Sequence, residues 1–105
     1  MRTQTFYSVV ASGGTVGGSV GIIGARTATM YLSTVTSGEL RLQGSPDNSN
    51  FAPVLSSTGS LWLRNTSVGS FAVALDDEAL AFPYIKPVLS VAQTDNRTIT
   101  VLVKL

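Results

Sequence analysis

The chain has 105 residues, the usual size of one domain, and we expect a single domain over residues 1–105. It contains no histidine and no cysteine, which excludes a Ser-His-Asp triad, a zinc site built on these ligands and a disulfide framework. Charged residues make up only 12%, where about 25% is typical of soluble domains, and the net charge is +1. The charge balance argues against nucleic-acid binding, and the low charge suggests that part of the surface is buried in an assembly.

Apolar and polar residues alternate along much of the chain, as in half-buried strands. In chain order, we expect strands near residues 5–10, 29–35, 39–43, 61–64, 68–75, 84–91 and 97–105. In the third of these, Leu40 and Leu42 should face the core. Pro87 should mark a sheet edge or a bulge. About seven or eight strands separated by turns predict an all-β antiparallel sandwich.

Residues 13–24 hold six of the ten glycines. Glycine at this density weakens a strand, so a flexible loop or a hairpin tip is one interpretation. The interleaved apolar residues favour another, an N-terminal arm over residues 1–24 that becomes ordered against a neighbouring subunit. The apolar side chains that we expect at this interface are Phe6, Tyr7, Val16, Val20, Ile22 and Ile23. Deletion of the arm should then abolish assembly and leave a folded β domain.

Trp62, the only tryptophan, lies out of phase with the leucines on either side of it. If those leucines face the core, Trp62 faces outward, where a neighbouring subunit could cover it. The alternative is that Trp62 lies in the core and the leucines are partly covered. The pattern alone does not choose between them.

Asp76, Asp77 and Glu78 make up half of the six acidic residues. A solvated loop, or the start of one helical turn over residues 76–80, is the simplest interpretation. A patch that faces the cations of a partner and a metal site are the alternatives. We expect no bound metal and no cofactor. We also expect no catalysis, because the one motif-like run, G-x-S-x-G at residues 17–21, lacks the histidine base that such a motif needs.

Three segments suggest a family: LRLQGSPDNSNF at residues 40–51, AFPYIK at 81–86 and VAQTDNRTITV at 91–101. Together they resemble small β-sandwich virion proteins of tailed bacteriophages. The pattern of that family has a Ser-x-Asp-Gly-x-x-Phe turn after a strand, a Phe-x-Tyr-Leu-Lys strand and a final Asn/Asp-Arg-x-Ile strand. This chain departs from it at Asn48, where glycine is expected, and at Pro87. The resemblance covers about two thirds of the chain and leaves out residues 1–39.

The resemblance implies a structural role in a virion. We expect a capsid decoration or cement protein that binds the major capsid protein and copies of itself, as a trimer, and stabilises the head through many weak contacts. One alternative is a neck, tail or fibre component of the virion. Another is a carbohydrate-binding module that uses Trp62, Tyr31 or Tyr84. We expect no nucleic-acid partner, no membrane partner, and a location in the virion after assembly in the host cytoplasm.

Overall fold

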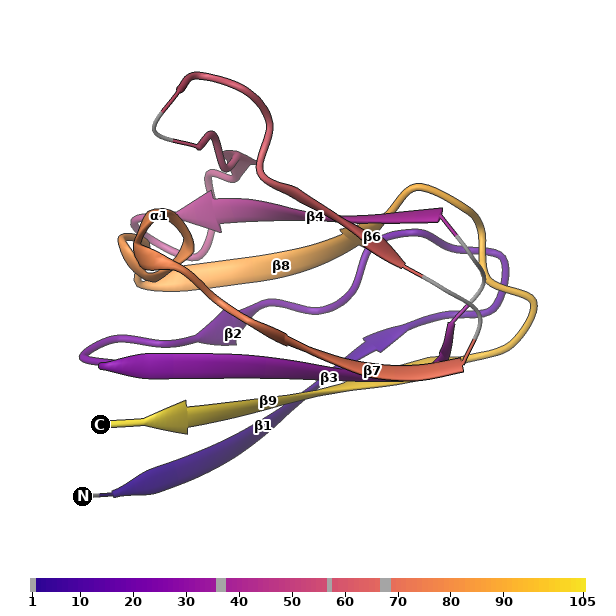
Figure 1. Ribbon diagram of the computed structural model, residues 1–105, viewed down its shortest axis with the longest axis horizontal. Helices are drawn as coiled ribbons and strands as arrows, with labels where there is room; N and C mark the ends of the chain where they lie inside the picture. Colours follow the sequence, from indigo (N-terminus) through magenta and orange to yellow (C-terminus); the bar gives the residue numbers. More distant parts are fainter. Residues whose placement is uncertain (1, 36–37, 57, 67–68) are drawn as a thin grey trace.

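The computed structural model describes residues 2–35, 38–56, 58–66 and 69–105, and it consists of two antiparallel sheets packed as a sandwich (Figure 1). This confirms the predicted all-β antiparallel sandwich. Sheet A has the strand order β1 (Thr3–Val10), β9 (Arg97–Lys104), β3 (Thr27–Val35) and β7 (Gly69–Ala74). Sheet B has the order β2 (Val20–Gly21), β8 (Tyr84–Leu89), β4 (Gly38–Ser45) and β5 (Ala52–Pro53), and β6 (Leu63–Thr66) also pairs with β4. A single helical turn, α1 (Asp77–Leu80), joins β7 to β8.

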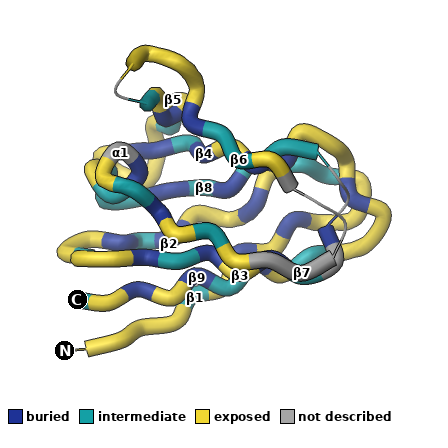
Figure 2. Tube along the Cα trace, in the orientation of Figure 1, coloured by how far each residue is buried: buried dark blue, intermediate teal, exposed yellow. Residues whose placement is uncertain are grey.

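The core lies between the two sheets, where alternate residues of each strand meet (Figure 2). Leu40 and Leu42 of β4 are buried, as the alternation predicts, while Arg41 between them is exposed. The inward residues of β9 are Ile99, Val101 and Val103. Period-two patterning therefore determines which face of each long strand supplies the core.

The glycine-rich segment runs along the edge of sheet B and does not project from the domain (Figure 1). The Gly17 amide donates to the Pro87 carbonyl at 2.9 Å, and β2 pairs with the start of β8. Val20 and Ile22 are buried in the core of this chain. These two side chains are therefore not available to a neighbouring subunit, contrary to the expectation from the sequence.

Pro87 lies within β8 because its missing N–H faces the glycine-rich segment and not β4. The Pro87 carbonyl accepts from Gly17, and the N–H and C=O of one residue point to the same side of an antiparallel strand. No bond of the β4 ladder is lost there. The prediction of an edge or a bulge at Pro87 is wrong, because β8 lies between β2 and β4 and pairs with β4 without a register shift. The proline is tolerated because the other side of β8 is paired only in short stretches.

The N-terminal strand β1 is part of sheet A and pairs with β9 along its whole length, from Thr3 to Val10. Val10 is fully buried and Phe6 packs partly against the core. Deletion of residues 1–24 would thus remove an entire strand together with buried side chains of the core. We expect that deletion to unfold the domain, which reverses the expectation that a folded β domain remains.

The turn after β4 is organised by the carboxylate of Asp47. It accepts hydrogen bonds from the backbone amides of Ser49 and Asn50, at 2.9 and 2.8 Å, and from the Ser45 hydroxyl at 2.9 Å. These bonds, the amide of Asn50 foremost, hold the pKa of Asp47 well below its usual range. Asn48 has φ 63°, a left-handed conformation that asparagine tolerates better than most residues. Asparagine can therefore stand where the resemblance expects glycine.

Candidate interaction surface

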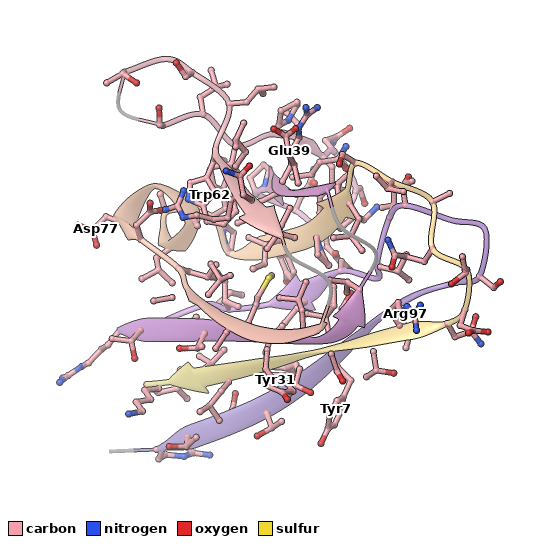
Figure 3. The ribbon with its side chains drawn as sticks, turned by 45° about the vertical axis from the view of Figure 1, so that its right-hand side comes forward. Tyr7, Tyr31, Glu39, Trp62, Asp77 and Arg97 are labelled. Carbon is pink, nitrogen blue, oxygen red and sulfur yellow. The ribbon has the colours of Figure 1, made fainter. Side chains whose placement is uncertain are left out.

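The outer face of sheet A is a continuous, exposed surface built from the outward residues of its strands. The register aligns Tyr7 of β1 with Thr100 of β9, and Thr100 with Tyr31 of β3. The two tyrosines thus flank one threonine in a single row, and both project from the same side of the sheet (Figure 3). Two strand spacings separate their backbones, which is about 10 Å.

This face, called face A below, is nearly uncharged, and it carries large exposed apolar side chains among threonines. Tyr7 is 67% exposed and Tyr31 is 47% exposed, and Val9 and Leu102 are also exposed. The described outward residues of its four strands are Thr3, Thr5, Tyr7, Val9, Thr98, Thr100, Leu102, Lys104, Thr27, Thr29, Tyr31, Ser33, Ala72 and Ala74. Lys104 is the only Asp, Glu, Lys or Arg in this set. Depletion of charge together with exposed aromatic residues is typical of the centre of a protein interface.

The outer side of sheet B has a different chemistry. Glu39 and Arg41 of β4 form an ion pair at 2.9 Å, and the Lys86 ammonium lies 4.0 Å from the centre of the Phe51 ring. The charges on this side are therefore paired with neighbours in the same chain. A hollow of about 140 Å³ opens beside Arg41 and Leu61. It is too small for an ordinary organic ligand.

A second hollow, of about 320 Å³, lies at one end of the sandwich between residues 22–25 and 80–83. Ile23, which is 65% exposed, is at its rim. No charged side chain lines it among the described residues. It offers neither an acid nor a base to a bound molecule.

Trp62 is buried, so the structure favours the second of the two alternatives left open by the sequence. Only 2% of Trp62 is exposed, while Leu61 is exposed and Leu63 is half-buried. The indole N–H donates to the Asp76 carboxylate at 2.8 Å, and the Arg64 guanidinium stacks 4.4 Å from the ring centre. Arg64 also forms an ion pair with Asp76 at 2.8 Å. Trp62 thus belongs to the core and to a polar cluster of this chain.

Asp76 links this cluster to α1. Its side chain caps the helical turn at the Ala79 amide, which agrees with the expected helix start. Partial burial raises the pKa of Asp76, but the hydrogen bonds from Trp62, Arg64 and Ala79 outweigh it and leave that pKa below its usual value. Asp77 is exposed, and the Glu78 side chain lies outside the described residues. Within the described part of the chain, no group of three histidine, cysteine or acidic residues could hold a metal ion.

The residues expected at an interface do not converge on one surface. Tyr7 is on face A, whereas Val16 is exposed beside Val88 of sheet B, and Ile23 is at the end of the sandwich. The sequence predicts Tyr31 only as a sugar contact and predicts no interface role for Leu102. The available signal was the outward phase of β3 and β9, since residues that alternate with core positions share a face.

Comparison with known proteins gives no family assignment. A scan against models of known families finds no match, and a search of curated proteins finds no similar sequence. Among the described residues, no helix is long and apolar enough to span a membrane.

Proposed function

We propose that this protein is a structural subunit of a bacteriophage virion, a decoration or cement protein that binds the lattice of the major capsid protein and stabilises the head. The observation that carries the proposal is face A, an exposed sheet face with two tyrosines and a single charge at one end. The resemblance of residues 40–103 to virion sandwich proteins supplies the identity of the partner. The absence of histidine and cysteine fits a role without catalysis.

Face A would bind by covering its exposed tyrosine, valine and leucine side chains and not by pairing charges. Interfaces of this kind take most of their affinity from a few buried aromatic side chains, here Tyr7 and Tyr31. A lattice repeats the same contact many times, so modest individual contacts add up to firm attachment. The head is then stabilised because each bound copy favours the assembled shell over free subunits.

The proposal is tested by binding of the purified chain to capsids of the phage that carries it. Tyr31→Lys places a charge at the centre of face A. Loss of one central aromatic contact costs about 2 kcal/mol, or about 30-fold in affinity per contact. Leu55→Lys is the matched control, because Leu55 is 50% exposed and lies on the side of sheet B, away from face A.

The proposal requires that the wild-type chain and Leu55→Lys co-sediment with capsids and that Tyr31→Lys stays in the supernatant. Equal binding by both variants would mean that face A is not the docking surface. If no chain binds capsids but all bind isolated tails or necks, the alternative of a neck, tail or fibre component takes its place.

A carbohydrate-binding module is the second candidate, because Tyr7 and Tyr31 offer two aromatic platforms on one face. Trp62 no longer supports this reading, since it is buried, and Tyr84 is half-buried against Gly21. A glycan array decides the matter. Glycan binding that Tyr31→Ala abolishes would favour this candidate, and an array without hits would refute it.

A further inference from the structure

Strand β1 forms one outer edge of sheet A, and the hydrogen bonds at its start reveal which backbone groups face that edge (Figure 1). The Leu105 amide donates to the Arg2 carbonyl at 2.8 Å, so Arg2 points its backbone groups toward the C-terminal strand. Orientation alternates along an antiparallel strand, and therefore the even-numbered residues of β1 pair with β9. The N–H and C=O groups of Thr3, Thr5, Tyr7 and Val9 point away from the sheet.

Within the described part of the chain, these outward groups have no backbone hydrogen-bond partner. Natural edge strands are usually blunted by a charge, a proline, a bulge or a short length. Strand β1 has eight residues, TQTFYSVV, without a charge, a proline or a glycine, and its pairing with β9 has no register shift. This edge is therefore open to pairing with another strand.

The geometry points to a second copy of this chain as the occupant, with the two β1 strands paired antiparallel about a two-fold axis at Phe6. In that register Thr3 pairs with Val9 of the other copy, and Thr5 pairs with Tyr7. The two-fold axis generates each of these two pairings twice, which makes four hydrogen-bonded pairs. Each pair exchanges two bonds, so all eight outward groups of each copy find partners. A register shifted by two residues in either direction brings only three of the four outward residues of β1 opposite one another.

The same register also matches the two faces of the sheets. Opposed residues of antiparallel strands lie on one face, so the exposed residues of one β1 meet exposed residues of the other. At the axis, Phe6 meets its own copy in a non-hydrogen-bonded pair, where side chains approach most closely. Phe6 is only half-buried in the single chain, and the aromatic pair would cover its remaining surface. Because β1 carries no charge, the pairing brings no like charges of the two strands opposite each other.

Sedimentation equilibrium of the purified chain over a range of concentrations tests this pairing. The mass should rise from 11.0 kDa to twice that value. Thr5→Pro removes an outward N–H without touching the bonds to β9, and proline is tolerated at such edge positions. We expect Thr5→Pro to remain at 11.0 kDa, and Thr5→Ala, which keeps the N–H, to dimerise like the wild type.

Engineered cysteines test the register, since the chain has none of its own. Under oxidation, Thr5→Cys and Tyr7→Cys chains should cross-link to each other at least several-fold more than either does to itself. Directly paired residues lie at a Cα separation that suits a disulfide, whereas residues two positions out of register do not.

A wild-type chain that stays monomeric at all concentrations overturns the inference. So does a Thr5→Pro chain that is folded by circular dichroism and dimerises normally. A mass near three chains would replace the two-fold axis with the trimer expected from the sequence. The pairing does not depend on which partner face A binds.

Discussion

Replacement of Asp76 by alanine would remove three interactions at once. The capping bond to Ala79 is worth about 1 kcal/mol. Loss of the acceptor leaves the indole N–H of buried Trp62 unpaired, at a cost of about 1 kcal/mol or more. The ion pair with Arg64 is partly exposed, so it adds less than about 1 kcal/mol. The sum is a loss of about 2–3 kcal/mol in the free energy of unfolding.

Urea denaturation followed by Trp62 fluorescence measures this loss directly. Asp76→Asn keeps an oxygen that can accept from the indole and the helix amide, and loses the charge together with the oxygen that accepts from Arg64. It should therefore cost about 1 kcal/mol. Asp77→Ala, at an exposed neighbouring position, should stay within about 0.5 kcal/mol of the wild type. If Asp76→Ala lowers the free energy of unfolding no more than Asp76→Asn does, the bonds from Trp62 and Ala79 to Asp76 do not stabilise the fold.

Three further predictions concern the glycine segment and the Asp47 turn. Gly17→Ala should lower the free energy of unfolding by about 1–3 kcal/mol, because the added Cβ would collide with Ser8 and Pro87. Gly18→Ala should lower it by less than about 1 kcal/mol, because nothing lies within 4 Å of a Cβ at that position. Thermal unfolding measures both, and equal effects would contradict the close approach at Gly17. Because the pKa of Asp47 is lowered, the turn should be fully ordered above about pH 4 and should loosen as the pH falls through that lowered pKa. Amide resonances of the turn would report this, and Asp47→Asn should lose the pH dependence; a turn insensitive to both would refute it. Because Asn48 has a left-handed conformation, Asn48→Gly should be as stable as the wild type or more stable by up to about 1 kcal/mol. Asn48→Val should lower the free energy of unfolding by about 1–2 kcal/mol. Urea unfolding measures both, and the reverse order would rule out the left-handed conformation.

Local patterning was enough to predict the long strands. Alternation located β4 and β9 to within a few residues and identified the inward faces, because a half-buried strand must repeat every two residues. The helical turn near Asp76 was also visible, since a capping aspartate precedes it. These features depend only on neighbouring residues.

What could not be predicted depends on pairing between distant segments. Val20 and Ile22 looked like interface residues, because nothing in a glycine-rich run shows that β8 lies beside it. Trp62 remained ambiguous until Asp76, 14 residues away in sequence, was placed beside its indole. Face A likewise exists only because β1 and β3 lie on either side of β9, an order that no local pattern records.

The most direct test of the proposed function is a cryo-electron microscopy reconstruction of the virion at a resolution that places side chains. The proposal predicts density for this sandwich on the outer surface of the head, with Tyr7 and Tyr31 of face A turned toward the major capsid protein. Density confined to the neck, tail or fibres would contradict the decoration role. Density on the head with face A turned to solvent would contradict the docking surface.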